Sequence, residues 1–309
     1  MTAPDARRGA VVVTGAHSGI GLACTVALED AGYLVFAGVR RPLDAEGLRR
    51  RSPERICPLI LDVSDPAQIA AAHDMVADRV GPAGLAGLVN VAGIGAAIPV
   101  ETLTSEQIRG IFDVNVFGLV EMTRVMLPLI RAGRGRVVNI GSVGDRFSMP
   151  FGGALSASKA AVAMLTESMR MELRPWGIHV CLIEPGSINT PAVDRLEAAA
   201  DRMIEGWDDN ARQLYAHAVR AMVRQAAVQE REHSSSADTV AGTVLRALSV
   251  RRPATRYLTG RHARLLAGMS ALLPDRAFDQ VRLRVLGQPT AFGSGPDRSG
   301  RLANTGIPG

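Results

Sequence analysis

Lysine is nearly absent from this sequence. Of the 35 basic residues in 309, one, Lys159, is a lysine and the rest are arginine. The chain therefore uses arginine for ordinary surface charge. A single lysine indicates a position where a planar, bulky guanidinium cannot replace a compact ammonium group.

Aromatic residues and cysteines are also few. Aromatics make up 4% of the chain and the basic residues are scattered, so we interpret the net charge of +5 as a solubility feature. Nucleic-acid binding is the weaker alternative. Cys24, Cys57 and Cys181 show no CxxC or metal-ligand spacing and lie in apolar stretches. They are predicted to be small core residues in a reducing compartment, with neither a disulfide framework nor a metal site.

Long apolar runs are missing. No uninterrupted apolar stretch reaches the length of a membrane span, so we expect no membrane-spanning segment. The short polar stretch 1–9 lacks the apolar segment of a signal peptide. The expectation is a cytoplasmic protein.

Apolar β-branched runs alternate with amphipathic helical stretches, the pattern of βαβ units in a parallel sheet. With 47% hydrophobic residues, the chain can bury one large core. Predicted strands are 11–14, 34–37, 56–61, 87–90, 136–140, 179–183 and 256–258. Predicted helices are 22–31, 66–80, 105–132, 153–173 and 237–248. The sequence thus predicts an α/β fold with a doubly wound, seven-stranded parallel sheet and helices on both faces.

The expected layout is one domain with additions at its ends. An N-terminal extension, 1–9, precedes a domain over 10–260, in which the helical stretch at about 190–232 is a plausible lid over a substrate. A helical segment, 261–287, carries an apolar stripe that we interpret as core or subunit contact rather than as a membrane anchor. The Gly/Pro/Ser-rich tail, 288–309, is predicted to be disordered.

A glycine-rich turn follows the first predicted strand and opens the first helix. It reads Thr14-Gly15-Ala16-His17-Ser18-Gly19-Ile20-Gly21, with G-x-x-x-G-x-G spacing. Glycines allow close approach to a pyrophosphate, and free N–H groups at a helix N-terminus favour an anion. Three glycines alone are weak evidence, but their place at the first strand-to-helix turn predicts a dinucleotide site.

The end of the second strand bears on the choice of cofactor. It reads Gly38-Val39-Arg40-Arg41, without the acid that would accept from the ribose hydroxyls of NAD. Two guanidinium groups favour the 2′-phosphate of NADP, with Arg40 as the contact and NAD as the alternative. The alternative explanation of these two arginines is that they are solvated residues at the end of a strand. Asp62, at the end of the third strand, is placed to accept from the adenine amino group.

These motifs resemble the classical short-chain dehydrogenase/reductase family over about residues 10–260. The resemblance rests on the glycine turn, Asn90 to Gly93, Asn115, Ser142, Lys159 and Pro185-Gly186. It implies a Rossmann-type fold, NADP or NAD as cofactor, and catalytic roles for Ser142, Asn115 and Lys159. The cofactor-binding residues it implies are Gly15, His17, Ser18, Gly19, Ile20, Gly21, Arg40, Asp62, Val63, Asn90, Ala92, Gly93, Lys159, Pro185, Gly186 and Ile188.

One residue of the family pattern is missing. The family places a proton-donating tyrosine four residues before its lysine, one helical turn away, so that the ammonium lowers the phenol pKa. Here that position is Leu155. Ser156 cannot simply take over, because one residue along a helix rotates a side chain by about 100°. Tyr215, alone or with His217, is the candidate for a substitute donor on the lid, but the preferred interpretation is that both are ordinary lid residues.

Three functions stay open on the sequence. The first is an oxidoreductase acting on a lipophilic alcohol or carbonyl, an interpretation supported by the resemblance of 256–260 to the branch acting on steroids and retinoids. The second is a non-redox catalyst of cyclisation or isomerisation, and the third is a silent cofactor-binding protein. The expected substrate pocket consists of Leu155, Phe147, Met149 and Phe151. The resemblance also implies a homodimer or homotetramer built on the helices that contain Asn115 and Lys159.

Overall fold

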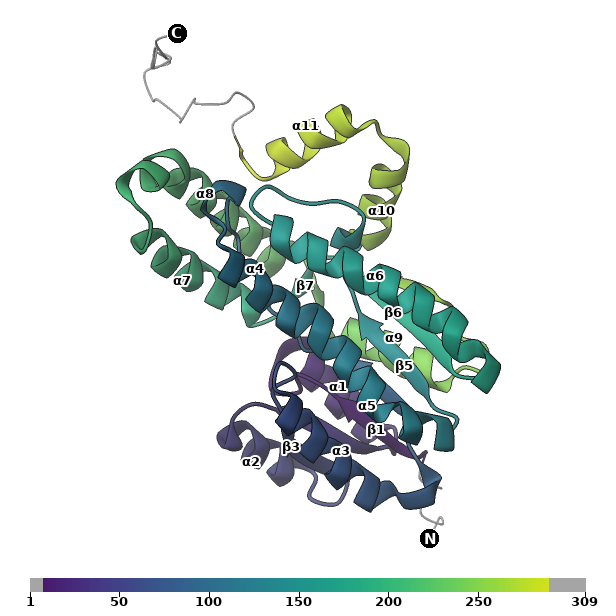
Figure 1. The fold of residues 1–309 in the computed structure, drawn as a ribbon. Coiled ribbons are helices and arrows are strands. Elements are labelled where there is room, and N and C mark those ends of the chain that lie inside the picture. The colour runs from purple at the N-terminus through teal and green to yellow at the C-terminus, as the bar shows by residue number, and fades with distance from the viewer. Residues whose placement is uncertain (1–7, 289–309) are drawn as a thin grey trace, which may run out of the picture.

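The computed structural model describes residues 8–288, with the side chains of 192–195 left out. Most of the N-terminal extension and nearly all of the tail lie outside the described residues. Seven parallel strands form one sheet in the order β3-β2-β1-β4-β5-β6-β9, which confirms the predicted fold class (Figure 1). The strands are β1 (Ala10–Val13), β2 (Leu34–Val39), β3 (Ile56–Ile60), β4 (Gly87–Asn90), β5 (Arg136–Ile140), β6 (His179–Pro185) and β9 (Arg256–Thr259).

Helices cover both faces of the sheet because its strands are apolar on both sides. Val11 and Val13 of β1 pack in the cluster under one layer of helices, and Val12 packs in the cluster under the other. The first layer is α1 (Gly19–Asp30), α2 (Pro42–Arg51) and α9 (Ala237–Ser249). The second is α3 (Pro66–Val80), α5 (Gly118–Ala132) and α6 (Gly153–Leu173). The strand order reverses between β1 and β4, where such sheets open a crevice for a ligand.

The single helix predicted over 105–132 is wrong. The structure has α4 (Ser105–Phe112), a π-helical turn over Asp113–Phe117, and then α5. The turn buries the side chain of Asn115. Gly118 follows it and lies so close to the segment after β3 that a Cβ there would be 2.6 Å from the carbonyl oxygen of Val63. Single π-helical turns of this kind are frequent at functional sites.

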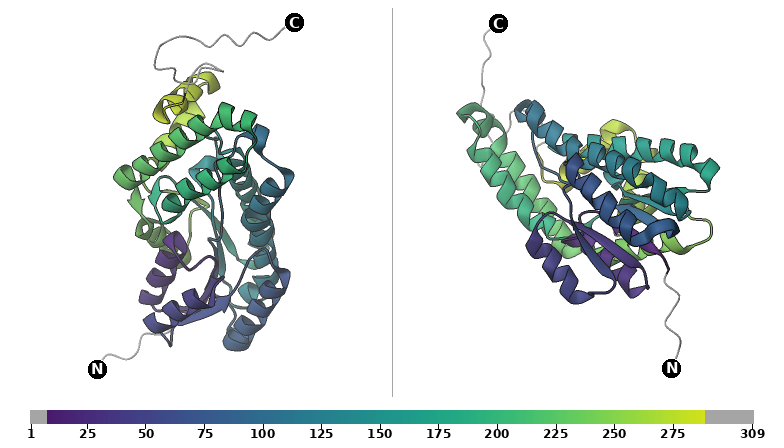
Figure 2. Two further views of the ribbon diagram at one scale, coloured as in Figure 1. Left: turned by 90° about the vertical axis from the view of Figure 1, so that its left-hand side faces the viewer. Right: turned by 60° about the horizontal axis from the view of Figure 1, so that its bottom comes forward.

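Four further helices lie toward the end of the sheet where its strands finish (Figures 1 and 2). They are α7 (Ala192–Glu205), α8 (Asp209–His233), α10 (Ala263–Leu272) and α11 (Asp275–Val285). The segment 190–232 contains no strand, as the sequence indicated. β7 (Ile188–Asn189) ends just before it and pairs with β8 (Ser235–Ser236) just after it, so the two ends of the segment lie side by side. The name lid is kept below as a label for residues 190–232.

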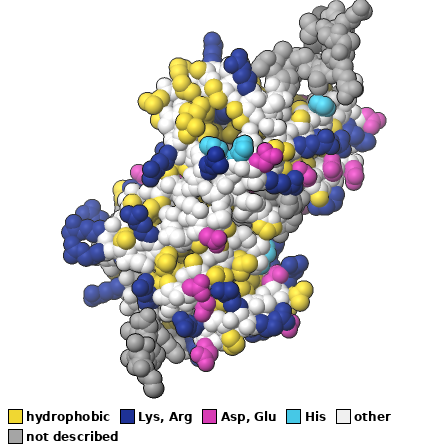
Figure 3. Space-filling model, turned by 180° about the vertical axis from the view of Figure 1, so that it is seen from behind, with side chains coloured by type: hydrophobic (Ala, Val, Ile, Leu, Met, Phe, Trp, Pro, Cys, Tyr) yellow, Lys and Arg dark blue, Asp and Glu magenta, His cyan; other side chains and the backbone are white. Residues whose placement is uncertain are grey.

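The apolar stripe of the C-terminal segment is not core. Leu265 is 59% exposed and Leu272 is 84% exposed. Figure 3 shows hydrophobic side chains gathered over α10 and α11. None of the helices within residues 8–288 combines the length and hydrophobicity needed to cross a membrane.

The cysteines have no disulfide partners. Cys24 and Cys181 are buried and Cys57 is half-buried. Burial raises the pKa of the Cys24 thiol to about 12 and that of Cys181 to about 11, so both stay protonated. They act as small core residues.

Candidate active site

The turn between β1 and α1 forms an anion cradle for which glycine is required. Gly15 and Gly19 have φ values of +66° and +53°, in the left-handed region that glycine adopts without strain. A Cβ on Gly21 would lie 2.1 Å from the carbonyl oxygen of Gly15. The first turn of α1 carries no acid, and the Ser18 side chain does not cap it. The helix N-terminus therefore presents N–H groups and a positive dipole end to a ligand.

A cavity of about 210 Å³ opens beside this cradle at the carboxyl ends of β1, β2, β3 and β4. Its lining includes eleven of the residues expected to bind the cofactor, from the glycine turn through Arg40, Asp62 and Val63 to Ala92 and Gly93. The sequence missed others because they are apolar: Val39, Leu61, Val91, Ile94 and Val114, together with Thr190 and Pro191 at the start of the lid. The residues present fit a bound dinucleotide, with its pyrophosphate at α1.

Asn90 does not line this cavity, contrary to its assignment as a cofactor-binding residue. Its side chain is 4% exposed and donates to Thr123 Oγ1 at 3.1 Å and to Asn139 Oδ1 at 2.9 Å. It therefore joins β4 to α5 and β5 inside the core. Pro185, Gly186 and Ile188 also lie outside the lining; Gly186 instead packs on the backbone of Arg261 and Ala263.

The two arginines after β2 have different surroundings. Arg41 makes a bidentate pair with Asp44, with both N–O distances 2.8 Å, and this pair lowers the pKa of the Asp44 carboxyl. Arg40 lines the cavity and has no hydrogen bond or ion pair within residues 8–288, although its charge acts on Asp44 and Asp62. Arg40 is thus the guanidinium free to bind a phosphate.

Asp62 lines the same end of the cavity. Its Oδ1 accepts from the backbone N–H of Ser64 at 2.9 Å and from the Ser64 hydroxyl at 2.6 Å. Desolvation opposes ionisation, but these two bonds and the nearby Arg40 hold the pKa of Asp62 below its usual value. The group is a carboxylate at neutral pH and can accept from an amino group.

Lys159 lies on α6 with its ammonium group in the core of the site. Its Nζ donates to the carbonyl oxygen of Ile140, at the end of β5, over 2.9 Å. A Cβ placed on Gly93 would lie 3.7 Å from the same Nζ, so the ammonium faces the cavity wall formed by the β4 end. Burial lowers the pKa of Lys159 from 10.5 to about 8. The only lysine of the chain is therefore a desolvated cation beside the cofactor site.

Asn115 connects the cavity wall to α6. Its Oδ1 accepts from the N–H of Ile94 at 2.8 Å, and its Nδ2 donates to Ile94 O and to Ser158 Oγ, each at 2.9 Å. Ser158 in turn donates to the carbonyl of Leu155. Both amide protons of Asn115 are therefore in use. Its side chain positions the β4–α4 loop against α6.

Ser142 follows β5 and caps a short 3-10 turn. Its Oγ accepts from the N–H of Gly144 at 3.0 Å, which leaves the hydroxyl proton available for a substrate oxygen. A Cβ on Gly144 would lie 3.3 Å from Ser142 Oγ and 3.8 Å from Ser156 Oγ. Ser156 therefore presents its hydroxyl on the same side of the turn as Ser142, a proximity that the sequence did not predict.

Leu155 forms an apolar wall at the position four residues before Lys159. It is half-buried, and its Cδ2 lies 2.9 Å from where a Cβ on Gly95 would be. Met149 and Phe151, from the loop before α6, pack against the cluster of the lid helices. Phe147 points elsewhere and packs on Phe278 of α11. Two of the four expected pocket residues thus contact the lid cluster, whereas Leu155 contacts Gly95 and Phe147 contacts α11.

Tyr215 is not poised as a substitute proton donor. Its hydroxyl donates to Glu101 Oε2 at 2.5 Å on the outer side of the lid, and this bond raises the pKa of the phenol. A phenol with a raised pKa is a poorer acid at neutral pH. Within residues 8–288, the hydrogen-bond and ring contacts of Tyr215 are with Glu101 and Phe151, and neither Ser142 nor Lys159 is among its partners.

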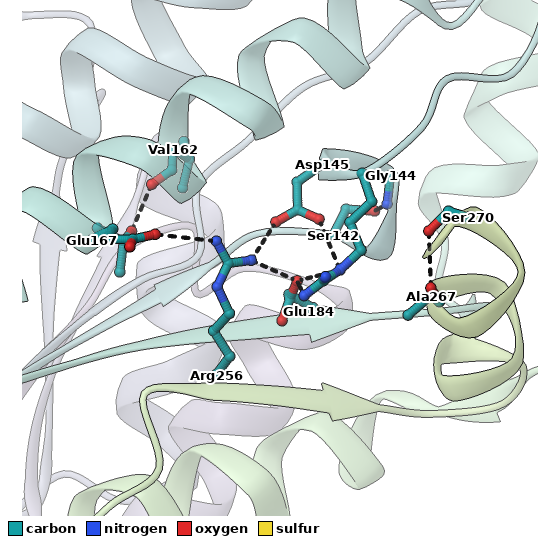
Figure 4. A network of polar contacts seen from close by, with 11 residues as sticks. Ser142, Gly144, Asp145, Val162, Glu167, Glu184, Arg256, Ala267 and Ser270 are labelled. Carbon is teal, nitrogen blue, oxygen red and sulfur yellow. Dashed lines mark hydrogen bonds and ion pairs between the residues drawn. The ribbon is translucent and has the colours of Figure 1, made fainter. Parts of the chain in front are cut away.

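A buried ionic cluster behind Ser142 was missed by the sequence analysis. Asp145 and Glu184 have side chains 1% and 0% exposed, and they face Arg146 and Arg256 (Figure 4). Glu184 accepts from Arg146 at 2.7 Å and from Arg256 at 3.0 Å, and Asp145 accepts from Arg256 at 3.2 Å. Burial and the charge of Glu184 raise the pKa of Asp145 to about 6. The cluster joins the Ser142 turn to β6 and β9.

Fold and site together define a dinucleotide-binding oxidoreductase scaffold, and the comparisons with known proteins agree. The family model described as short chain dehydrogenase matches residues 9–201, and the chain belongs to this family of oxidoreductases. It is 34% identical to Retinol dehydrogenase 5 of Mus musculus over 285 residues, 90% of this chain and 89% of the relative. It is 34% identical to Estradiol 17-beta-dehydrogenase 2 of Mus musculus, over 88% of this chain and 73% of the relative.

A solved structure gives the same result. The short chain dehydrogenase from Burkholderia cenocepacia J2315 in complex with NADP superimposes with a TM-score of 0.66 at 27% identity, covering 91% of this chain and 98% of that one. The likeness covers more of the chain than residues 9–201, the region that the family model matches.

The buried ammonium predicts a pH-dependent affinity for the cofactor. Lys159 is charged below pH 8 and neutral above it, so NADPH affinity should fall as pH rises from 7 to 9.5. Loss of a charge-assisted contact corresponds to about a 10- to 100-fold change. In Lys159→Met the affinity should be low and flat over this range. Fluorescence titration with NADPH at several pH values checks the prediction for the unmodified protein and for Lys159→Met.

The same substitution should raise the stability of the cofactor-free protein, although it lowers the affinity for NADPH. Because the folded pKa lies below the unfolded value of 10.5, burial of the charge destabilises the cofactor-free protein fully below pH 8, and the penalty disappears as pH rises toward 10.5. Cofactor-free Lys159→Met should therefore melt at a higher temperature than the unmodified protein at pH 7. Identical melting curves together with a pH-independent NADPH affinity in the unmodified protein would contradict the assignment.

Proposed function

We propose that this protein is an NADP-dependent dehydrogenase/reductase that interconverts an alcohol and a carbonyl on a lipophilic substrate, with no tyrosine at the usual proton-transfer position. The observation that carries the proposal is the placement of Lys159 and Ser142 at the end of β5, beside a dinucleotide cavity. The names of the relatives support a hydrophobic alcohol as substrate. The apolar lid cluster with Met149 and Phe151 supports it independently.

The preference for NADP follows from Arg40. Arg40 lines the cavity and has no hydrogen-bond or ion-pair partner among residues 8–288, whereas Arg41 is neutralised by Asp44. A guanidinium that binds a 2′-phosphate contributes about 1.5 to 3 kcal/mol. NAD lacks this phosphate and gains nothing from Arg40.

We expect NADPH to bind more tightly than NADH, and Arg40→Ala to remove most of that preference. The matched control is Arg41→Ala, one residue along, which should keep the preference because Arg41 already pairs with Asp44. Parallel fluorescence titrations with the two cofactors measure the ratio. Equal affinities in the unmodified protein, or an equal loss in both variants, would refute the role of Arg40.

Reduction of a carbonyl adds a hydride to carbon and a proton to oxygen. The dinucleotide, when bound, supplies the hydride. The Ser142 hydroxyl, whose proton is not used in the turn, donates a hydrogen bond to the carbonyl oxygen and polarises the carbonyl group. Water carries the proton that completes the alcohol, with Lys159, whose pKa is about 8, as a nearby reservoir. Without a positioned general acid, turnover is expected to be slower by about a hundred- to ten-thousand-fold than in a complete site.

Leu155→Tyr should therefore raise turnover by about a hundred-fold or more, because Ser142, Asn115 and Lys159 already surround the expected position of the phenol. The pH profile should show a new group that titrates below the free tyrosine value, since Lys159 stabilises the phenolate. Leu155→Phe adds the ring without the hydroxyl and should give no gain. Initial rates on hydrophobic alcohols and ketones check this, and equal rates in both variants would argue against the oxidoreductase proposal.

One observation favours a second candidate, a non-redox catalyst of cyclisation or isomerisation. Leu155 packs against Gly95 and makes this wall of the site apolar where a polar donor is expected. A dry pocket of that kind suits folding of a hydrophobic substrate. Product formation without consumption of NADPH would identify this activity.

We further infer that the protein assembles into a dimer or tetramer through α5 and α6. Phe117, at the start of α5, and Met164 and Met171 on α6 are 59%, 60% and 62% exposed. Met164 and Met171 are seven residues apart and share one helix face. Exposed apolar side chains in such a row are typical of an interface between subunits.

The double substitution Met164→Glu and Met171→Glu should dissociate the oligomer, because it places charges in an apolar contact. Met75→Glu on α3, where the methionine is 57% exposed, is the matched control and should leave the mass unchanged. Light scattering coupled to size-exclusion chromatography measures the mass. An unmodified protein that elutes as a monomer would refute the interface.

A further inference from the structure

The loop between the Ser142 turn and α6, here named the substrate loop, comprises Phe147 to Phe151. It joins the residues that carry Ser142 to the helix that carries Leu155 and Lys159. Its conformation therefore sets the space available to a substrate next to both catalytic side chains. Phe151 adopts φ = 63°, a left-handed conformation unfavourable for a bulky side chain. Such a conformation persists only where surrounding contacts fix it.

One end of the loop is fixed by the body of the protein. Phe151 O accepts from the N–H of Ile98 at 2.7 Å, and the N–H of Gly152 donates to Met149 O at 3.0 Å. The Phe151 ring packs edge-on against Tyr215 of α8, with 6.4 Å between centroids. These contacts leave the other end, around Phe147 and Ser148, to be held by something else.

That end is held by Arg282 of α11. Its guanidinium donates to the carbonyl oxygen of Ser148 and pairs with Asp279. The guanidinium carbon lies 4.6 Å from the ring centroid of Phe278 and 5.9 Å from that of Phe147, and the two rings meet edge-on at 5.2 Å. The Arg282 side chain is only 17% exposed. Stacking and hydrogen bonding therefore act together on one side of the loop.

The remainder of α11 ties this anchor to the lid. Phe278 is the buried residue of α11, and Leu286, which caps the helix, packs in the apolar cluster of α7 and α8. Gln288 donates to the carbonyl of Ala218 on α8 at 3.2 Å. The C-terminal helix thus contacts the substrate loop through Phe278 and Arg282, and Leu286 and Gln288 just after it contact the lid. It lies outside residues 9–201, the region that the family model matches.

We propose that Arg282 is a positioning residue that holds the Phe147–Ser148 end of the substrate loop, and that α11 thereby sets the shape of the substrate pocket. The effect on catalysis rests on the proposed function, whereas the effect on the loop does not. Arginine is required because a lysine at this position offers neither a flat face for two aromatic rings nor a fork of donors. Arg282→Lys should therefore behave like Arg282→Ala.

The test compares Arg282→Ala and Arg282→Lys with Arg284→Ala. Arg284 is exposed on the same helix and makes no side-chain hydrogen bond or ion pair within residues 8–288, so it is the matched control. Hydrogen–deuterium exchange of the amides of 146–152 should become about ten-fold faster in both Arg282 variants and stay unchanged in the control. Exchange in β1 and α1 should not change, and NADPH affinity should be preserved.

With a hydrophobic ketone as substrate, the Arg282 variants should show a KM raised by about ten-fold or more and a smaller change in kcat. Unchanged hydrogen–deuterium exchange of the loop in Arg282→Ala overturns the inference. A fall in NADPH affinity by the same factor as the rise in KM also overturns it. If Arg282→Ala fails to fold, Arg282→Lys decides by the same criteria. If the unmodified protein turns over no ketone or alcohol, the proposed function fails, and the exchange data still decide the role of Arg282.

Discussion

The hydrogen bond from Lys159 to the carbonyl of Ile140 is the interaction around which the site is organised. It fixes α6 to the end of β5, and so places Leu155 and Ser156 relative to Ser142. The ammonium also lies against the wall formed by Gly93, whose own position is fixed by the bond between Asn115 and Ile94. Because this pocket accepts only a small cation, a chain that otherwise uses arginine keeps one lysine here.

Two supporting layers surround that centre. Asn90, Thr123 and Asn139 form a buried amide and hydroxyl network behind the cavity. On the opposite side, Glu184 and Arg256 hold the turn that carries Ser142. Neither layer lines the dinucleotide cavity, but both limit the movement of residues beside it. A buried ionic cluster contributes little net stability on average, so its value here lies in fixing one geometry.

The sequence predicted the sheet well, because strands follow from local patterns, and most of the residues expected to bind the cofactor line the cavity at its edge. The turn from Gly15 to Gly21 carries its own explanation in glycine spacing, and Arg40 follows directly from the end of β2. Errors arose where the structure depends on distant contacts. The helix over 105–132 looked continuous because its residues are apolar at helical spacing, whereas the break depends on Ile94, Ser158 and Val63 from other segments.

Other features were missed for related reasons. The helix α2 was not predicted because its basic, weakly apolar sequence has only Ala45 and Leu48 buried. Asn90 was assigned to the ligand because it ends a strand beside the cavity, but its side chain turns inward. The Arg146–Glu184–Arg256 cluster and the Arg282 anchor join segments more than 35 residues apart, and arginine is too common in this chain to mark either.

The proton-transfer half of the site is where the chain departs from its family pattern, so hydride transfer is the central claim to test. The direct measurement uses NADPH deuterated at the transferred position, incubated with the unmodified protein and a panel of hydrophobic ketones, with products analysed by mass spectrometry. The account predicts alcohol products that carry one deuterium on the former carbonyl carbon. Rearranged products without deuterium, or no deuterated alcohol from any ketone despite saturating NADPH binding, would contradict it.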